Sequence, residues 1–566
     1  MAHASTSGMS AKDHARFASA QALHQAGDLP RARPVYTKLR RKYPRHRQVC
    51  LSLAALHLDS GEADEALKLL QPLARLARRD ANVHYNLGLA HASRDEHEQA
   101  VQAYRRAVSI DPQHPKAAFN LGVSLRNLDR QLEATEALLK DHALAPRHDN
   151  CRVLARAFTA LEDLPQAIRF ARESLTFDSA DHRDLRHLVS LLCQQIGEQV
   201  LVSDDESREL VHLAERSLAQ APNEPDCVAD LARVHATLGE PEAALPYLQR
   251  VCAMDPANEE MRTLHGLTQL VLGHVGEGWR ERTALARLRD PASGNGTPRL
   301  SGWPEPGTRL HLIGDQGIGD QILYARMLPR LMAEGVEVTY ACDNRLHPIL
   351  TRSMPGLGLA SQDTEVPGDA DVFCPIGELH IYEPERRPRA MAYLEPDPAL
   401  RTELRARYQS LHPGRKIIAL AWASHSQTTG GSKSVPIDAL APLFDLPGIT
   451  FVCAQYGEGA EAFRQASQQF GFEGHIDEDL QLAGNMDHAA AQLAAVDAFV
   501  SVSNASVHLA GALGVHTHVL VGKRGIWHWF DEGDRSIWYP HVDLHRQRSL
   551  VSWDDAVCSV ALAHTT

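Results

Sequence analysis

Small polar residues follow an apolar stretch in the segment 496–522, VDAFVSVSNASVHLAGALGVHTHVLVG. Residues 498–502 are predicted to form a buried strand, and Ser503, Asn504 and Ser506 are residue types that cap the start of a helix. A helix that begins at the carboxyl end of a strand presents unpaired N–H groups and a partial positive charge, which suit a phosphate. Gly511 permits the close approach of a ligand or of another part of the chain. The pattern fits an anion site and equally fits a helix that is only seated tightly on a sheet.

A second glycine-rich turn, GDQGIGD at 314–320, follows the predicted strand 310–313. It is not the GxGxxG pattern of dinucleotide-binding folds, and the chain has no Walker GKS or GKT sequence. Asp320 is expected at the first turn of the following helix, 321–334, where its carboxylate could act as a general base. From the residues alone, a helix-capping role worth about 1 kcal/mol is the better reading of Asp320.

These two turns belong to a C-terminal half in which strands and helices alternate, and this alternation predicts mostly parallel sheets with ligands at the carboxyl ends of the strands. Residues 396–398 mark a joint, so two Rossmann-like lobes are expected at 308–398 and 399–566, after a linker at 291–307. A connecting helix is expected within 401–411. The predicted strands are 310–313, 336–342, 371–376, 416–423, 450–455, 498–503, 517–521 and 542–544.

The N-terminal half repeats with a period of 34 residues, in blocks that begin at residues 13, 47, 81, 115 and 149. In the third block, small residues at Gly88 and Ala100 allow two helices to approach, Tyr104 fills the space beside them, and Pro112 ends the second helix. This spacing resembles the tetratricopeptide repeat over residues 13–290. The resemblance implies an all-α superhelix with a concave groove. The acidic stretch 201–209, LVSDDESRE, is expected to be a longer loop between two helices of the array.

The predicted groove suits a protein acceptor or adaptor, although a rigid spacer or a dimerisation arm would have the same pattern. Asn86 and Asn120 occupy the same place in successive repeats. Their amide groups carry both a donor and an acceptor, so they could bind the backbone of an extended peptide, or they could simply be solvated. The oligomeric state is left open.

The charge and amino-acid composition of the chain limit the kinds of binding partner and the cellular compartment that are expected. The net charge of −13, from 71 acidic and 58 basic residues, argues against a general nucleic-acid surface. The nine cysteines include no CxxC pair, which predicts isolated thiols in a reducing compartment and no zinc site. The first residues contain no apolar leader core, and no run of about 18 apolar residues occurs. A cytoplasmic protein without membrane insertion is expected.

Five motifs occur in a fixed order in the C-terminal half. They are QGIGDQILYARMLP at 316–329, GSKSVPIDALAPL at 431–443, CAQYG at 453–457, the stretch 482–514 and a late segment that begins WHWF at 527. With a repeat array ahead of them, they resemble bacterial tetratricopeptide-repeat glycosyltransferases of the GT-B class. The catalytic part is similar to heptosyltransferases, and the domain order is similar to that of O-GlcNAc transferase. The resemblance covers nearly the whole chain.

The resemblance implies transfer of a sugar from a nucleotide-sugar donor, with inversion, with no metal, and with no cofactor besides the donor itself. Asp320 matches the position of the candidate base. Trp527 and Trp529 would pack a sugar or base, or would only cover a core. The residues implied at the donor are Gln316, Gly317, Gly319, Lys433, Gln455, Tyr456, Asn485, Asp487, Ser503, Asn504, Ser506, His508 and Gly511.

Two departures from the family pattern bear on the donor. Trp422 is followed by Ala423 and Ser424 where relatives often have a basic residue, and Asn504-Ala505 replaces a common Asp-Thr. The leading expectation is transfer to a protein acceptor recruited by the repeats, with flagellin as one such acceptor. The alternatives are transfer to a glycan or a lipid-linked sugar, and a non-catalytic repeat scaffold with degenerate lobes. Retention of Asp320, Lys433 and His508 speaks against the scaffold.

Overall fold

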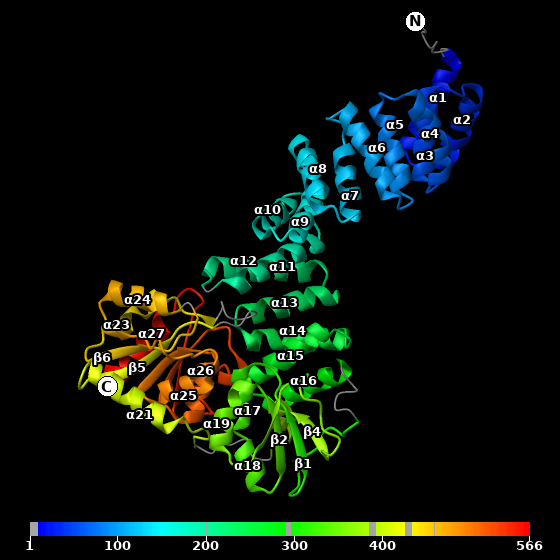
Figure 1. Cartoon of the computed structure of the whole chain (residues 1–566). Helices are drawn as coiled ribbons and strands as arrows, with labels where there is room; N and C mark the ends of the chain where they lie inside the picture. Colours follow the sequence, from blue (N-terminus) through cyan, green and yellow to red (C-terminus); the bar gives the residue numbers. More distant parts are fainter. Residues whose placement is uncertain are drawn as a thin grey trace. The chain divides into compact units, whose positions relative to one another are not determined.

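The structure is a computed structural model, which describes residues 9–199, 201–289, 296–383, 392–424, 433–457 and 459–565. The chain divides into two compact units, Met1–Leu191 and Leu192–Thr566. The first, the N-terminal unit, contains only helices. The second, the C-terminal unit, contains further helices followed by two sheets (Figure 1). The division falls within helix α11.

The predicted repeat array is helical throughout its described residues, with helices paired in antiparallel hairpins. Its helices are α1 Ala11–Gln25, α2 Leu29–Lys42, α3 Arg47–Asp59, α4 Ala63–Leu76, α5 Ala81–Ala92, α6 His97–Ile110, α7 Ala117–Asn127, α8 Gln131–Leu144, α9 His148–Ala160, α10 Leu164–Ser174, α11 His182–Glu198, α12 Asp204–Gln220, α13 Pro225–Thr237, α14 Pro241–Met254, α15 Glu259–Val271 and α16 Val275–Arg289. The predicted blocks therefore each begin within two residues of the start of an odd-numbered helix.

Packing between α5 and α6 follows the predicted exchange of small and large residues. A Cβ atom placed on Gly88 would lie 2.5 Å from Cε1 of Tyr104, which is fully buried. Gly122 and Leu138 repeat the arrangement between α7 and α8, with a Cβ at Gly122 lying 2.5 Å from Cγ of Leu138. Because these distances leave no room for a side chain, glycine at both positions sets how closely the two helices of each hairpin approach.

The prediction of a long acidic loop at 201–209 was wrong, because most of this stretch is the first turn of α12. The hydroxyl of Ser203 accepts a hydrogen bond from the backbone N–H of Glu206 (3.2 Å), and the Glu206 carboxylate accepts one from the Ser203 N–H (2.9 Å). This reciprocal capping box, together with Asp204 and Asp205 at the positive end of the helix dipole, stabilises the start of α12. The irregular spacing instead comes from two longer helices, α11 and α12, of 17 residues each.

The α/β region contains two entirely parallel sheets (Figure 1). The four-stranded sheet has the order β3-β2-β1-β4 and the six-stranded sheet the order β10-β9-β8-β5-β6-β7. Every predicted strand is present, and β3 and β7 were not predicted. The strands are β1 Arg309–Ile313, β2 Glu337–Cys342, β3 Gly358–Ser361, β4 Val372–Pro375, β5 Lys416–Ala421, β6 Ile449–Cys453, β7 Gly474–His475, β8 Ala498–Val502, β9 Thr517–Val521 and β10 Val542–Arg546.

One predicted helix, 321–334, is divided into two in the structure. The break falls at residues 326–327, just before Pro329, whose ring clashes with the preceding turn and which lacks an N–H to continue the helix. The helices of the α/β region are α17 Ile318–Ala325, α18 Leu328–Ala333, α19 His347–Ser353, α20 Leu379–Tyr382, α21 Pro398–Leu411, α23 Ala441–Phe444, α24 Gly459–Phe470, α25 Met486–Ala494, α26 Ala505–Leu513 and α27 Asp554–Thr565. Among the described residues, no helix is long and apolar enough to cross a membrane.

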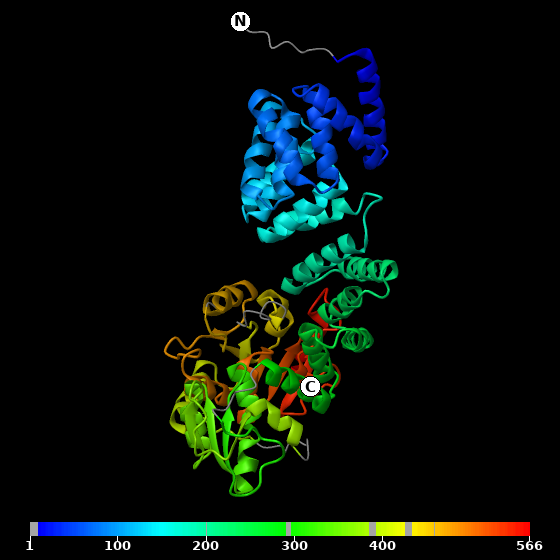
Figure 2. The same ribbon diagram turned by 90° about the vertical axis from the view of Figure 1, so that its right-hand side faces the viewer.

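The last repeat helices pack directly onto the α/β region (Figure 2). Trp279 of α16 is buried between Tyr324 and Trp527, with ring centroids 5.9 and 5.8 Å away. A Cβ placed on Gly377 would lie 2.6 Å from the Trp279 ring. Since Trp279 shares one hydrophobic core with both sheets, α16 is a structural part of the C-terminal unit.

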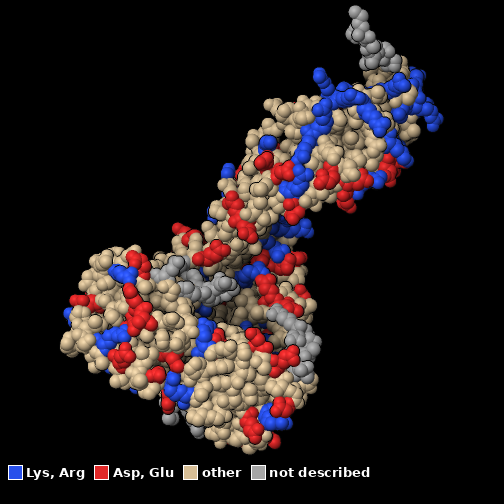
Figure 3. All heavy atoms as spheres, viewed as in Figure 1, with Lys and Arg blue, Asp and Glu red and all other residues tan. Residues whose placement is uncertain are grey.

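Charged side chains are unevenly distributed over the face drawn in Figure 3. Lys and Arg atoms gather over the N-terminal helices, whereas both signs of charge are mixed over the α/β region. The three basic residues in the last turn of α2, Arg40, Arg41 and Lys42, contribute to the basic character of these helices. The chain as a whole carries a net negative charge, but basic side chains predominate on this face of its N-terminal helices.

Candidate functional site

The two glycine-containing turns lie next to each other, because α17 packs against α26. Each of these helices follows a strand, β1 or β8, so each begins at the carboxyl edge of its sheet. A Cβ placed on Gly319 would lie only 3.1 Å from the Cα of Ala505 and 3.1 Å from Cδ2 of His508. Glycine at 319 thus permits the contact that brings Asp320 to the start of α26.

Asp320 both caps a helix and forms an ion pair. One carboxylate oxygen accepts a hydrogen bond from the N–H of Gly317 (3.3 Å), which is the predicted helix-stabilising contact. The other lies 2.7 Å from Nε2 of His528. Burial alone would raise the pKa of Asp320, but the hydrogen bond and charge of His528 outweigh it and hold the pKa below its usual value. Asp320 is therefore a carboxylate at neutral pH.

His508 is buried beneath this carboxylate. It is 3% exposed, stacks on Trp529 at 5.3 Å, and places Nδ1 3.2 Å from the hydroxyl of Tyr539. Burial, with the neighbouring His528, lowers the pKa of His508 to about 3, so the ring is neutral. Trp527 and Trp529 are both buried, which favours the core-covering role that the sequence had left open for them.

Lys433 supplies a cation near the same place. Burial lowers the pKa of its ammonium group, and the negative charge of Asp320 partly offsets that effect. Lys433 also acts electrostatically on His508. Its motif begins at 431, and residues 431 and 432 lie outside the described residues.

Three predicted donor residues have structural partners within the chain. The Ser503 hydroxyl accepts a hydrogen bond from Nε1 of Trp529 (2.8 Å), and the Asn504 side chain caps α26 by accepting from the N–H of Val507 (3.2 Å). The Gln455 side-chain oxygen accepts from two backbone N–H groups at the end of β5, those of Trp422 and Ala423, at 3.0 and 2.8 Å. These side chains fix the edge of the six-stranded sheet.

Gly511 permits a close approach, as expected, but the neighbour is Tyr539 and not a ligand. A Cβ at position 511 would lie 2.5 Å from Cγ of the Tyr539 ring. Gly511 therefore has an internal packing role, and its contact with the donor stays a prediction.

A cavity of about 100 Å³ lies beside the start of α26. It is lined by residues from segments that connect the strands of both sheets. Of the predicted donor residues, Tyr456 and Ser506 line it, and Ile318 and Met486 add apolar walls. Arg345, which the sequence did not single out, also lines the cavity; its guanidinium pairs with Asp343 at 2.7 Å and donates to the carbonyl of Ala483 at 3.0 Å.

The predicted residues near α25 surround this cavity without lining it. The side chain of Asn485 caps α25 by accepting from the N–H groups of Asp487 (2.9 Å) and His488 (3.4 Å). The Asp487 carboxylate is paired with Arg352.

Gln316, in the turn before α17, is exposed and has a φ of +64°. Its carbonyl accepts a hydrogen bond from the side-chain nitrogen of Gln321 at 3.5 Å.

Asp315 is a second carboxyl group in the turn before α17 that sequence reasoning missed. Its Oδ1 is buried and has no hydrogen-bond partner in the part of the chain that the structure describes, and burial raises the pKa of Asp315 to about 6. His528 was also missed, because it is 208 residues from Asp320 in sequence. The WHWF motif that contains His528 was the signal that could have indicated it.

The two repeat asparagines lie half-buried on α5 and α7. The amide nitrogen of Asn120 donates to the hydroxyl of Tyr85 at 3.0 Å, so part of its hydrogen-bonding capacity is used within the array. Peptide binding by Asn86 and Asn120 stays a prediction.

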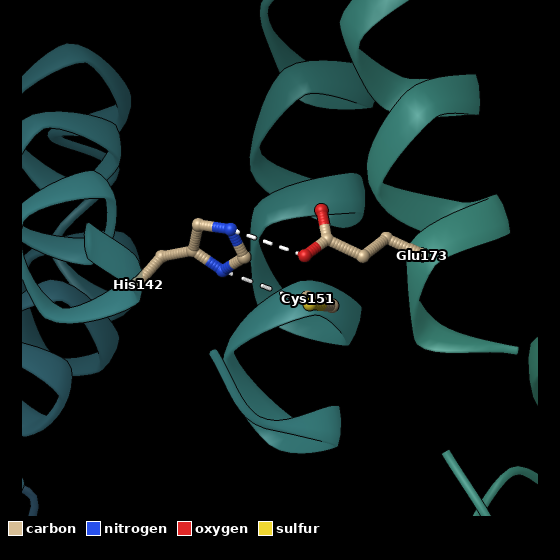
Figure 4. A group of neighbouring side chains, drawn as sticks. All are labelled: His142, Cys151 and Glu173. Atoms are coloured by element: carbon tan, nitrogen blue, oxygen red, sulfur yellow. Dashed lines mark hydrogen bonds and ion pairs between the residues drawn. The ribbon is translucent and has the colours of Figure 1, made fainter. Parts of the chain in front are cut away.

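Two groups of potential metal ligands occur among the described residues, although the sequence predicts none. In the first, drawn in Figure 4, His142 lies between Glu173 and Cys151, with Nε2 3.2 Å from the carboxylate and Nδ1 3.7 Å from the thiol. Burial raises the pKa of Cys151 to about 12, so the thiol keeps its proton. Because the two partners engage opposite nitrogens of the ring, this group is a hydrogen-bonded chain that links α8, α9 and α10.

Comparison with known proteins identifies relatives of part of the chain. Protein FlbA of Caulobacter vibrioides is 30% identical over 377 residues, a match that covers 62% of this chain and 63% of FlbA. Among solved structures, YrrB, a repeat protein with an unusual peptide-binding site, is 16% identical, with 34% of this chain and 95% of YrrB covered and a TM-score of 0.31. MamA is 22% identical, with 28% and 92% covered and a TM-score of 0.26.

The repeats themselves match an established family. Residues 51–115 match the tetratricopeptide repeat. The matched segment runs from α3 to the turn before α7 and contains the Gly88–Tyr104 contact. These residues belong to the tetratricopeptide repeat family and lie in an N-terminal region rich in such repeats.

Proposed function

We propose that the α/β region is a GT-B-type glycosyltransferase that moves a sugar from a nucleotide-sugar donor to a protein acceptor held by the repeats. The observation that carries this proposal is the close contact of α17 with α26. It places the carboxylate of Asp320 beside the N-terminus of a helix that follows a parallel strand, next to a cavity. Parallel sheets bind ligands at this edge.

The donor would lie along α26. Its diphosphate would accept hydrogen bonds from N–H groups in the first turn of α26 that Asn504 does not cap, with Lys433 as the neighbouring cation. The nucleoside would occupy the cavity, where Tyr456 and Met486 supply flat and apolar surface and Arg345 supplies donors.

In the reaction, the acceptor hydroxyl would transfer its proton to Asp320 as its oxygen attacks the anomeric carbon, and the bond from that carbon to the diphosphate would break. Attack from the face opposite the leaving group inverts the anomeric centre. The hydrogen bond from His528 would hold the Asp320 carboxylate in place. The same contact lowers the pKa of Asp320, so the carboxylate stays ionised. The start of α26 and Lys433 would stabilise the charge on the leaving diphosphate.

The direct test uses the full-length protein and a panel of nucleotide sugars, scored by thermal stabilisation and by donor hydrolysis. A matching donor should raise the melting temperature, and Lys433→Ala should weaken its binding by about 1–3 kcal/mol, the range for losing a hydrogen bond to a charged group. The matched control is Lys140→Ala, an exposed lysine of α8. Absence of stabilisation and of hydrolysis across the panel would overturn the proposal.

The acceptor is the second part of the proposal. Tetratricopeptide repeats form surfaces that hold extended partners, so a protein acceptor fits the array better than a free sugar. Incubating the enzyme and labelled donor with flagellin, with a glycan and with a lipid-linked sugar separates the candidates. Label in the glycan or the lipid-linked sugar alone would replace the protein acceptor with that substrate.

A further inference from the structure

Four histidines and one aspartate gather on one face of the six-stranded sheet, beneath α27. His516 precedes β9 and His518 lies within it, while Asp543 and His545 lie on β10 and His564 lies on α27. His518 and Asp543 are direct partners in the β9–β10 ladder, and each is the second residue of its strand. His516, His518 and Asp543 are therefore near the amino ends of the strands, at the edge opposite the turn that precedes α26.

Three of these side chains present ligand atoms to a common point. Nε2 of His516 is 3.0 Å from Oδ2 of Asp543, and Nδ1 of His518 is 4.0 Å from the same oxygen. One atom from each of the three residues lies within 4.8 Å of the other two. A tetrahedral ion with bonds of about 2.0–2.2 Å holds its ligands about 3.3–3.6 Å apart, so a small side-chain adjustment suffices.

His545 connects His518 to α27. Nε2 of His545 lies 3.0 Å from Nδ1 of His518, and Nδ1 of His545 lies 2.9 Å from the hydroxyl of Ser559 on α27. Because Nδ1 of His518 also faces Asp543, an ion bound there would replace the hydrogen bond between His518 and His545.

Within the described part of the chain, two ring nitrogens of this group lack the hydrogen bonds that a purely structural cluster would be expected to make. His518 is 1% exposed, and its Nε2, like Nε2 of His564, is buried with no hydrogen-bond partner among the described residues. Lys416 lies 3.0 Å from Nδ1 of His564, which makes His564 a neighbour of the site and not a ligand.

We propose that His516, His518 and Asp543 bind a divalent transition-metal ion such as Zn²⁺. Two imidazoles with one carboxylate suit such an ion, whereas Ca²⁺ and Mg²⁺ prefer sites made of oxygen ligands. The ion would join β9 and β10. It would take no part in the donor chemistry, because Asp320 and α26 start at the other edge of the sheet.

The test is calorimetric titration of Zn²⁺ into the full-length protein after removal of metal by a chelator, with thermal melting as a second readout. Loss of an outer partner costs about 10–100-fold in metal affinity, so His516→Gln or Asp543→Asn should weaken binding by more than about 100-fold. Each variant should also lose the Zn²⁺-dependent rise in melting temperature. Half of the His516 side chain is exposed, so His516→Gln keeps the fold.

Two further variants make the result decisive. His541→Gln removes an exposed histidine just before β10 and should bind Zn²⁺ as the parent does. Cys151→Ala removes a ligand of the other candidate group and should also leave binding unchanged. The proposal is overturned if the parent binds no Zn²⁺, if His516→Gln and Asp543→Asn bind it normally, or if Cys151→Ala abolishes binding.

Discussion

Asp320 has two roles that a single substitution separates. Asparagine can still accept the capping bond from Gly317 but cannot take a proton from an acceptor hydroxyl. If Asp320 is the general base, Asp320→Asn should lower turnover by about 10²–10⁴-fold. Donor affinity, measured by calorimetry, should change little, because the start of α26 and Lys433 are untouched.

His528→Gln is the companion variant, because it removes the ion pair and keeps Asp320. The pKa of Asp320 should then rise, so the acidic limb of the pH–rate profile should move to higher pH. A merely structural histidine would lower stability without moving that limb. Turnover of Asp320→Asn within a few-fold of the parent, at saturating substrates, would show that Asp320 is a helix cap.

Asp315 gives a prediction about stability and pH. Its pKa is raised from 3.8 to about 6 in the folded chain, so the unfolded chain ionises first as pH rises. The contribution of Asp315 to stability is therefore fully present below about pH 4 and is lost as pH rises to about 6. Asp315→Asn should match the parent at pH 4 and exceed its free energy of unfolding by up to about 3 kcal/mol at pH 7. Denaturant melts at the two pH values measure this difference, and an equal effect at both would contradict the shift.

Residue types near one turn could be predicted, and long-range pairings could not. Capping side chains at 503–506 and the acid at 320 are local signals, since a cap acts within its own turn. The partners that decide their chemistry are distant in sequence: His528 for Asp320, Trp529 for Ser503 and Tyr539 for Gly511. In each case the missing information was which segments pack together.

At the scale of elements, the crossing of α17 and α26 depends on Gly319. Gly319→Ala would place a methyl group 3.1 Å from the backbone of Ala505, so the helices must separate. Overpacking of this kind costs typically about 1–3 kcal/mol, more than the gain of about 1 kcal/mol from replacing glycine in a helix. Donor affinity should fall as well, since α26 moves relative to Asp320. Gly302→Ala is the control, because open space surrounds that glycine, and equal behaviour of the two variants would refute the close-contact argument.

The start of α12 shows what element prediction can miss. The S-x-x-E spacing of Ser203 and Glu206 is a capping-box signature, yet the surrounding acidic residues suggested a loop. Ser203→Ala should lower the free energy of unfolding by about 0.5–2 kcal/mol, whereas Ser203→Asp should keep most of it, since both residue types cap. Denaturant melts of the three proteins give the comparison. No loss in Ser203→Ala would mean that tertiary packing alone holds α12.

At the scale of the molecule, period and strand pattern predicted the order of the chain: helical repeats and then parallel sheets. They could not indicate which repeats pack on the sheets. The Arg524 guanidinium donates to the carbonyls of Ile196 and Gln199, and Trp279 lies in the core shared with both sheets. A boundary drawn at residue 290 follows the change in composition, whereas these contacts make α12–α16 part of the C-terminal unit.

This grouping determines how acceptor recruitment should be tested. A fragment 182–566 keeps α11 whole and retains every contact between α12–α16 and the sheets, so it should fold and bind donor as the full chain does. A fragment 296–566 would expose the surface that covers Trp279 and should melt at a lower temperature or aggregate. If helices α1–α10 hold the acceptor, fragment 182–566 should hydrolyse donor at the parental rate but transfer sugar to the protein acceptor far more slowly. Short acceptor peptides at high concentration should restore transfer, because they do not need recruitment. Parental transfer by this fragment at low acceptor concentration would show that the recruiting surface lies within the C-terminal unit.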